Sequence, residues 1–531
     1  MKKSTKTFYA TATLLTLFSL IERGLGFLYR IALSYKLGEE SLGIYQAALS
    51  VFGVFLTIGV GGLPVTLSRF IAKSKAEKTP LQESKTLSSG LFLSALLSLA
   101  PALLFLALSP LVSPLLLPDE RCLPVLKILL LGSFFASGFA CLRGYFWGNK
   151  QFLAPTLFEV IEESFQVFSG IIFLSLNGET PLLERVAWAN TLSYMLSFCI
   201  SIAYFFAKKG KFSSPLPLAK SLFVATLPIT SLRLTSSLLT SAISVALPIA
   251  LVQSGLTQVD AMKIYGVVTG MVLPVLFLPA TLIGSLSVVI SPTLSESFYS
   301  SNTAKLKRTI QSGLTAAFLL AGGLIPLLFT LGEEVGELIF SSALAGEMIR
   351  NCCPILLPMT ISMISTTILN SLGFTKQTFK FFLVGSAFSI FCILLLPQKI
   401  GGYAHLVGMG GSFALTALCS LIFLQKRGWL DGEFYKNLLL TCALILPTSL
   451  VGQLLKSLLS GIFGDLVACV SIGGLLLGFT IALYFVVLSK KQVKATKKSQ
   501  KLLKIRLFFR RILDNCKKLF YNIFKAEKSA Q

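Results

Sequence analysis

Three arginines lie inside apolar runs of this sequence. Arg233 lies in the run 221–252, and Arg23 and Arg30 lie in the first run, 8–33. A guanidinium deep in a bilayer costs on the order of 3 kcal/mol or more, so such a residue usually faces a hydrated cavity and serves a function. Arg23 and Arg30 are spaced to share one helix face. Together the three arginines predict a polar chamber suited to an anionic ligand.

Carboxylates form a second group. Glu159, Glu162 and Glu163 fall on one stripe of an apolar run at 153–176, and Glu22 adjoins Arg23 in the first run. Buried carboxylates beside guanidiniums can form ion pairs that hold helices together, or they can titrate. Both interpretations stay open: a lock between two helices, or a proton- or cation-linked switch that frees an arginine for substrate.

The elements that must position these groups are membrane-spanning helices. The chain has 531 residues, of which 54% are hydrophobic and 13% charged, with a mean hydropathy of +0.78. A soluble protein carries about 25% charged residues. The apolar runs are long enough to cross roughly 30 Å of hydrocarbon as helix. We therefore predict an all-α polytopic membrane protein with about fourteen transmembrane helices, at 8–33, 43–68, 87–109, 123–145, 153–176, 186–207, 221–252, 267–291, 310–331, 351–372, 381–396, 403–424, 437–456 and 466–488.

A weak internal sequence repeat divides the predicted helices into two sets. The segment 43–45 (Gly-Ile-Tyr) follows the first arginine helix, and 263–266 (Lys-Ile-Tyr-Gly) follows the second. Paired repeats around a central cleft are a common transporter plan. We expect two pseudo-symmetric lobes around a central cavity, followed by two helices and a tail, with boundaries at 1–220, 221–430, 431–488 and 489–531.

The net charge of +24 indicates topology. Most lysines and arginines fall in the loops on the side of the two termini, and the positive-inside rule then places both termini in the cytoplasm. The charge therefore indicates attraction to anionic lipids rather than to nucleic acid. The first run has no convincing cleavage site after it, so we expect an uncleaved first span.

The tail 489–531 is basic and periodic. Its apolar residues recur at alternating steps of three and four, which predicts an amphipathic helix at Leu502, Ile505, Phe509, Ile512, Cys516, Leu519 and Ile523. Aromatic residues with Lys and Arg favour the surface of the inner leaflet and its anionic lipids. A partner helix is the alternative occupant of the same stripe.

Several functional classes are disfavoured. No GxxxxGK[ST] loop is present, so direct use of ATP is not expected. The ten cysteines are scattered without a CxxC pair, and a single histidine, His405, cannot form a His-rich metal site. No Ser/His/Asp arrangement is found. We expect no enzyme activity, no metal and no cofactor.

Five stretches carry a family resemblance: 22–30, 38–46, 61–65, 254–274 and 285–292. They resemble the sporulation stage V protein B branch of polysaccharide transporters. That branch belongs to the multidrug/oligosaccharidyl-lipid/polysaccharide (MOP) exporter superfamily, which includes the MurJ-type lipid II flippases. The resemblance implies two lobes around a cavity and flipping of an undecaprenyl-pyrophosphate-linked sugar across the plasma membrane. It also implies a role in cell wall or spore cortex synthesis, with wall-synthesis enzymes as further partners, in a Gram-positive bacterium.

The resemblance also bears on individual residues. Basic residues of the first helix in such flippases are thought to engage pyrophosphate, and Arg23 matches such a position, whereas Arg30 is near one. Arg233 is assigned by its depth, with support from the family. Three alternatives stay open: a cation-coupled multidrug antiporter of the same superfamily with Glu22 as the coupling acid, a membrane glycosyltransferase, and a scaffold for wall synthesis.

Overall fold

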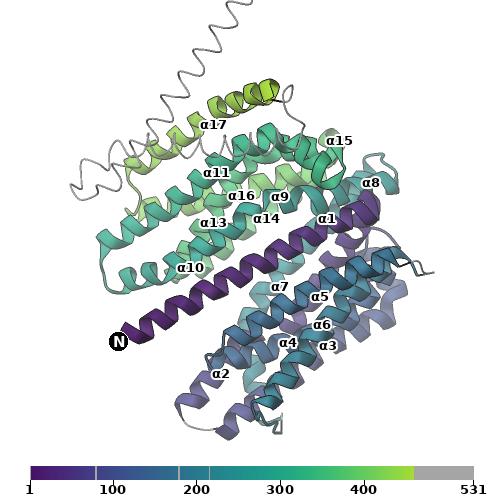
Figure 1. The fold of residues 1–531 in the computed structure, drawn as a ribbon, viewed down its shortest axis with the longest axis vertical. Coiled ribbons are helices and arrows are strands. Elements are labelled where there is room, and N and C mark those ends of the chain that lie inside the picture. The colour runs from purple at the N-terminus through teal and green to yellow at the C-terminus, as the bar shows by residue number, and fades with distance from the viewer. Residues whose placement is uncertain (1, 78–79, 177–179, 215, 460–531) are drawn as a thin grey trace, which may run out of the picture. The chain divides into compact units, whose positions relative to one another are not determined.

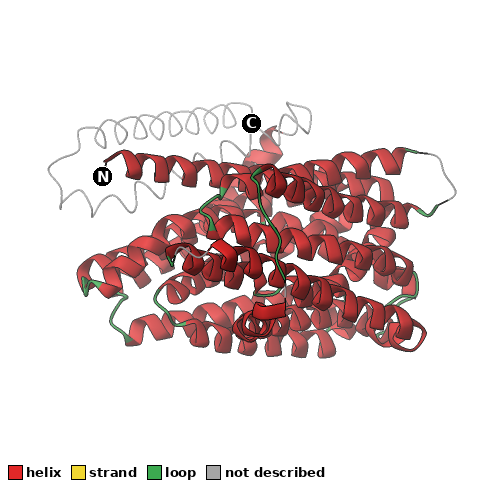
Figure 2. Cartoon of the chain, turned by 90° about the horizontal axis from the view of Figure 1, so that it is seen from below, coloured by secondary structure: helices red, strands yellow, loops and turns green. Residues whose placement is uncertain are grey.

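The structure is a computed structural model that describes residues 2–77, 80–176, 180–214 and 216–459. Within these ranges the chain forms only helices, turns and loops, without a β-strand (Figure 2). The predicted last span, 466–488, and the predicted amphipathic tail, 489–531, lie outside the described residues. The rest of the prediction, an all-α polytopic architecture, is confirmed.

The elements follow one another along the chain as helices joined by short connections (Figure 1). Their bounds are α1 Lys2–Val60, α2 Leu63–Ala76, α3 Pro80–Leu116, α4 Cys122–Gly148, α5 Leu153–Ser175, α6 Leu182–Ala207, α7 Leu216–Gln253, α8 Gln258–Gly266, η1 Val267–Val272, α9 Leu273–Leu276, α10 Leu278–Tyr299, α11 Thr303–Phe340, α12 Ala343–Cys352, η2 Cys353–Ile355, α13 Leu356–Ser371, α14 Thr375–Leu395, α15 Pro397–Ile400, α16 Tyr403–Lys426 and α17 Gly432–Leu459.

Among the described residues, 12 helical stretches are long and apolar enough to cross a membrane. The stretch Leu17–Lys75 covers residues 17–33 of the first predicted span and all of the second, because the backbone stays nearly helical through the turn between them. The predicted eighth span is divided into two such stretches, Gln258–Leu276 and Leu278–Tyr299. Helix α5 is not among the 12. It carries Glu159, Glu162 and Glu163 within its 23 residues, which is more charge than an ordinary span has.

A hinge at Gly38 separates the first two predicted spans within α1. Gly38 has φ 73° and ψ 175°, a conformation outside the helical region that glycine adopts without a Cβ clash. Beyond this hinge, α1 packs against α8. A Cβ added to Gly43 would lie 2.1 Å from the Met262 carbonyl oxygen, and one added to Gly266 would lie 2.0 Å from that of Glu39. The two segments of the sequence repeat, 43–45 and 263–266, therefore meet at a helix crossing that requires glycine on both helices.

The span that follows α8 changes its helical geometry twice. Residues 267–272 form the π-helix η1, and a turn at Phe277 separates α9 from α10. Pro274 and Pro279 lack an N–H and interrupt the regular hydrogen-bond ladder, which accounts for both irregularities. Neighbouring helices can satisfy the backbone groups that such breaks release.

The helices form two compact units. Unit 1 comprises the described residues up to Ser285 together with Glu333–Cys352 and Thr375–Leu418, and unit 2 comprises Leu286–Gly332, Cys353–Phe374 and the described residues from Cys419. These units are defined by packing alone. The lobes expected from the sequence stay a prediction.

Unit 1 has an apolar core where α2 to α7 pack together. In Figure 1, α5 lies beside α1 with α6 next to it, in keeping with the packing of α1 on α5 and of α5 on α6. Aromatic edges contact one another in this core, with Phe146 and Phe158 both packed on Tyr204. The buried cluster consists of Leu63, Leu67, Ile71, Leu87, Leu93, Phe139, Cys141, Leu142, Phe146, Phe158, Phe205 and Leu222.

Unit 2 is held by hydroxyl pairs and aromatic contacts. The hydroxyl oxygens of Ser287 and Thr367 lie 3.0 Å apart, and those of Ser291 and Ser371 lie 2.5 Å apart. Two hydrogen bonds between hydroxyl groups therefore join α10 to α13. Such pairs stabilise helix association in membranes. At one end of the unit the Arg427 guanidinium lies 4.3 Å from the centre of the Phe374 ring, an arrangement that also attracts the two groups electrostatically.

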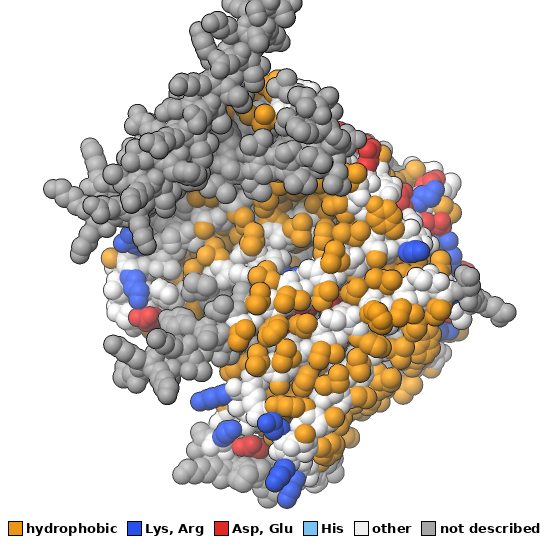
Figure 3. All heavy atoms as spheres, viewed as in Figure 1, with side chains coloured by type: hydrophobic (Ala, Val, Ile, Leu, Met, Phe, Trp, Pro, Cys, Tyr) orange, Lys and Arg blue, Asp and Glu red, His pale blue; other side chains and the backbone are white. Residues whose placement is uncertain are grey.

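The outer face of unit 1 is apolar over α5 and α6 (Figure 3). Phe168 of α5 is 67% exposed there, together with Ile161, Ile171 and Trp188. Lysines and arginines gather at one end of this face. An apolar face of this extent is expected of a surface solvated by lipid tails.

Candidate functional site

The two arginines of α1 are accessible. Arg23 and Arg30 are exposed, and no ion pair is recorded for either among the described residues. Arg30 interacts electrostatically with Glu163 of α5 and with the buried Tyr45. Glu22 is partly buried and interacts with Arg23, Glu159 and Arg143. The first helix therefore presents cations beside the carboxylates of α5.

The α5 carboxylates lie between α1 and α4. Glu159 forms an ion pair with Arg143 of α4, whose guanidinium also lies 5.2 Å from the centre of the Trp147 ring. Glu163 faces α1, since a Cβ added to Gly26 would lie 2.8 Å from its Oε1. Arg30, Glu22 and the three α5 carboxylates are thus brought into one polar cluster, which we call the α1–α4–α5 cluster.

Two members of the α1–α4–α5 cluster keep unmatched polar atoms. Oε2 of Glu162 is buried without a hydrogen-bond partner, and so is Nε of Arg143. Buried polar atoms in proteins almost always have partners, so each exception needs a physical account. A carboxylate oxygen that accepts nothing is free to take a proton or a cation, which is what a coupling group must do.

Arg233 lies in different surroundings, at the break between α1 and α2. Its Nη1 donates a hydrogen bond of 2.8 Å to the Gly61 carbonyl oxygen. One turn earlier on α7, the Thr230 hydroxyl accepts a 2.9 Å hydrogen bond from the Gly62 N–H. The side chain of Arg233 is otherwise exposed, without an ion pair in the described chain. Its remaining N–H groups are therefore available to a ligand.

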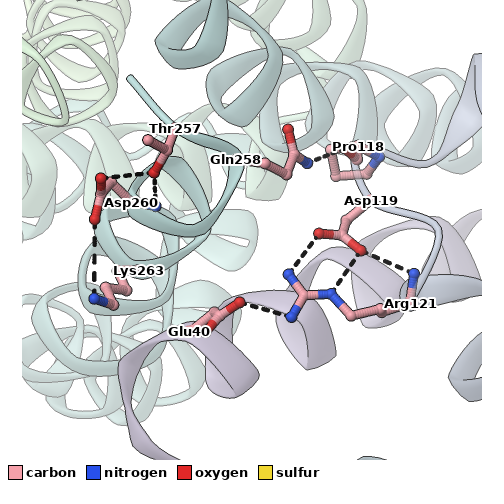
Figure 4. Close-up of polar contacts among 8 residues, drawn as sticks. All are labelled: Glu40, Pro118, Asp119, Arg121, Thr257, Gln258, Asp260 and Lys263. Carbon is pink, nitrogen blue, oxygen red and sulfur yellow. Dashed lines mark hydrogen bonds and ion pairs between the residues drawn. The ribbon is translucent and has the colours of Figure 1, made fainter.

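A further polar network lies where α1, the α3–α4 connection and the start of α8 meet (Figure 4). The Arg121 guanidinium donates to both oxygens of Asp119, at 3.0 and 2.8 Å, and to Glu40 at 2.6 Å. Gln258 donates to the Pro118 carbonyl oxygen at 2.6 Å. This network ties three segments together at the ends of their helices.

The residues of this network lower the pKa of the Asp119 carboxyl group. Burial by itself would raise the pKa of Asp119, but the hydrogen bonds and the charge of Arg121 outweigh burial and hold that pKa below its ordinary value. The same bonds raise the pKa of the Arg121 guanidinium. The pair is therefore fully ionised near neutral pH.

Some of these residues were not predicted from the sequence. Arg143 lies four residues before Trp147, near the end of α4, so from the sequence it resembles an interfacial anchor until its partner on α5 is known. Thr230 is one of many hydroxyl residues on its helix. Only the spacing of Asp119 and Arg121 gives a local signal, because side chains two residues apart around a turn can pair.

The fold is similar to that of transporters whose structures have been solved. It superposes on a lipid II flippase MurJ in an inward closed conformation with a TM-score of 0.71 and 15% identity, over 90% of this chain and 99% of that chain. It also superposes on an inward-facing multidrug resistance MATE family transporter of the MOP superfamily, with a TM-score of 0.64 and 15% identity over 76% and 94% of the chains. The chain thus has the fold of MOP-superfamily transporters, with many helices long and apolar enough to cross a membrane.

The family follows from the sequence comparison. A family model described as polysaccharide biosynthesis protein matches residues 9–298, and the chain belongs to this family. Stage V sporulation protein B of Bacillus subtilis (strain 168) is 25% identical over 371 residues, 66% of this chain and 70% of that protein. The lipid II flippase MurJ of the same organism is 21% identical over 486 residues, 85% and 88% of the two chains. The predicted resemblance to the polysaccharide transporter branch is confirmed.

Proposed function

We propose that this protein is a flippase that moves an undecaprenyl-pyrophosphate-linked sugar, a lipid II-like or polysaccharide precursor, across the plasma membrane by alternating access. The observation that carries the proposal is the presence of three exposed arginines, Arg23, Arg30 and Arg233, in apolar helices of a MurJ-like fold. Similarity to a lipid II flippase and to a sporulation protein supports a role in cell wall or spore cortex synthesis. The protein acts as a transporter and not as an enzyme.

The chemistry of the substrate class matches these residues. A lipid-linked sugar has an anionic pyrophosphate, a polar head and a long apolar tail. Guanidinium groups bind phosphate oxygens through paired N–H donors, which suits arginine better than lysine. The pyrophosphate would meet Arg23, Arg30 and Arg233 in a hydrated cavity, while the tail stays in lipid along an apolar helix face.

Energy coupling is assigned to the α1–α4–α5 cluster. In this proposal Glu22, Glu159, Glu162 and Glu163 exchange a proton or a cation as the lobes rock, and Arg30 is released from Glu163 to the substrate. The unmatched Oε2 of Glu162 supports such a role. Both termini face the cytoplasm in this scheme, as the charge bias requires. Partners include anionic lipids at the tail and enzymes of wall synthesis.

Complementation tests the proposal. We expect the wild-type protein to restore lipid II flipping in a cell depleted of its own flippase. Arg23→Ala and Arg233→Ala should lose this activity by about tenfold or more, since each removes a charged hydrogen-bond donor worth roughly 1.5–3 kcal/mol. Arg308→Ala is the matched control, because Arg308 is an exposed arginine at the start of α11.

The outcomes are distinct. Membrane levels of each variant are measured by immunoblot, so that loss of protein is separated from loss of function. Full activity of both Arg23→Ala and Arg233→Ala would exclude the arginines as substrate ligands.

A second candidate function is a cation-coupled drug antiporter. The similarity in fold to a multidrug resistance MATE transporter favours it, as does the partly buried Glu22 on the first helix. The exposed guanidiniums oppose it, because they repel cationic drugs. Drug susceptibility of a sensitised host separates the two functions: the antiporter protects that host, and the flippase does not.

A further inference from the structure

The second predicted span, 43–68, is interrupted between α1 and α2, and two side chains of α7 form hydrogen bonds with the backbone at this break. The break arises because Pro64 has no N–H and Gly61 adopts φ +33°, so the ladder between α1 and α2 is interrupted at Gly61 and Gly62. Arg233 satisfies the Gly61 carbonyl, and Thr230 satisfies the Gly62 N–H. Within a membrane such freed backbone groups must find partners in the protein.

The contact is close enough to be specific. A Cβ added to Gly61 would lie 2.5 Å from the Thr230 hydroxyl oxygen, and one added to Gly62 would lie 2.7 Å from Cβ of Ile229. Only glycine allows α7 to approach both residues in this way. The break and its two partners, Thr230 and Arg233, therefore form one unit, which we call the α7 latch.

We propose that the substrate pyrophosphate operates the α7 latch by taking Arg233 away from the Gly61 carbonyl. This inference rests on the proposed function and adds its regulation. A guanidinium can bond a phosphate oxyanion through two parallel N–H groups with opposite charge, whereas the neutral Gly61 carbonyl accepts one such bond from Arg233. Once Arg233 turns to the pyrophosphate, the Gly61 carbonyl loses its partner, and only the hydrogen bond between Thr230 and the Gly62 N–H still holds α7 at the break, so α7 separates more easily. Substrate binding is thereby linked to the helix movement that alternating access requires.

The linkage predicts an unusual variant. If the latch competes with the substrate for Arg233, then a weaker latch raises the affinity for the substrate, because less free energy is needed to open it. Thr230→Val removes the hydrogen bond to Gly62 with little change of shape and leaves Arg233 intact. We expect it to bind undecaprenyl pyrophosphate about three- to tenfold more tightly than wild type, the range that loss of one neutral hydrogen bond allows.

Binding is measured by titrating undecaprenyl pyrophosphate into the full-length protein in nanodiscs. Thr230→Ser keeps a hydroxyl and should restore the wild-type affinity. Thr235→Val is the matched control, because the Thr235 hydroxyl bonds only the Ser231 carbonyl of its own helix, and its affinity should equal that of wild type. An unchanged or lower affinity of Thr230→Val would overturn the latch while leaving the proposed function intact.

A distance measurement tests the movement itself. Spin labels at Lys73→Cys on α2 and Lys220→Cys on α7, both exposed positions, report the separation of the two helices in a background in which Cys199, Cys419, Cys442, Cys469 and Cys516 are replaced by serine and the remaining cysteines are buried. Undecaprenyl pyrophosphate should lengthen this distance, and Thr230→Val should lengthen it without ligand. Binding to wild type without a change in distance contradicts the latch alone. Absence of any binding contradicts both the latch and the proposed function.

Discussion

A guanidinium that forms no ion pair is costly in a membrane-spanning helix. Arg23, Arg30 and Arg233 are exposed and form no ion pair, although Arg30 lies in the field of Glu163 and Arg233 bonds the Gly61 carbonyl. A residue retained at this cost usually has a function. A diphosphate would give each guanidinium an anionic hydrogen-bond partner, and it would compete with Glu163 for Arg30.

Glu162 is the residue whose protonation we expect to matter most, because its Oε2 is buried without a partner. Glu162→Gln keeps the shape of the side chain and removes its ionisation. We expect it to slow flipping in cells about tenfold, within the range of coupling between two sites. Binding of undecaprenyl pyrophosphate should stay unchanged.

The matched control for Glu162 is Glu296→Gln. The Glu296 carboxylate is 70% exposed on α10 and pairs only with Lys305 at the surface, so its variant should flip at the wild-type rate. A Glu162→Gln protein as active as this control would leave the α5 carboxylates a structural role only.

Arg143 and Glu159 should stabilise the fold as a pair. Their side chains are 26% and 22% exposed, so removal of one partner leaves a largely buried charge. We expect Glu159→Gln to lower the free energy of unfolding by about 1–3 kcal/mol, below the range for a fully buried pair. Arg143→Met in addition should recover much of this loss, because no charge is then left alone. Thermal melting in detergent measures all three proteins, and additive losses in the double variant would contradict the pairing.

Part of the site could be predicted from residue type alone. Charged residues inside apolar runs identified Arg23, Arg30, Arg233 and the α5 carboxylates, since polar atoms at that depth need a reason. Arg143 and Thr230 could not be identified in this way. Their importance depends on which helix packs beside them, and hydropathy does not encode such contacts.

At the scale of helices, the apolar runs predicted the spans well because length and hydropathy are set by the thickness of the bilayer. The breaks were harder to predict. Gly61 and Gly62 precede Pro64, a combination that permits a bend, and the structure has a break between α1 and α2 there. The π-helix η1 was not predicted, because its wider turn depends on packing against α12 and α1 as well as on Pro274.

The network at Asp119 should make the junction of α1, the α3–α4 connection and α8 sensitive to acid. The pKa of Asp119 is lowered in the folded protein, so its stabilisation is complete above the ordinary value of 3.8 and is lost as pH falls through the lowered pKa. We expect amide exchange in residues 117–122 to accelerate below about pH 4.

Asp119→Asn provides the comparison. It cannot ionise, so its exchange in this segment should already be fast at neutral pH and should change little on acidification beyond the intrinsic rate. Equal pH profiles for the wild type and this variant would show that the Asp119–Arg121 pair does not hold the junction.

At the scale of the whole molecule, the polar sites are concentrated in one part of the chain. The α1–α4–α5 cluster, the α7 latch and the Asp119 network all fall within residues 9–298, the range that the family model matches. The remaining described helices contribute a long apolar surface, hydroxyl-mediated packing and further ion pairs, among them Arg350–Glu333 and Lys307–Asp431. In the proposed function, the substrate and coupling groups act in the first eight predicted spans.

The most direct test of the account is translocation by the purified protein in liposomes. A fluorescent lipid-linked pyrophosphate sugar is placed in both leaflets, and a membrane-impermeant quencher reports the fraction that reaches the outside. We predict rapid, complete quenching with the wild-type protein and with Arg308→Ala, and about half of the signal protected with Arg23→Ala or Arg233→Ala, as in protein-free vesicles. Equal translocation by all four proteins would contradict the central claim that these guanidiniums carry the pyrophosphate across the membrane.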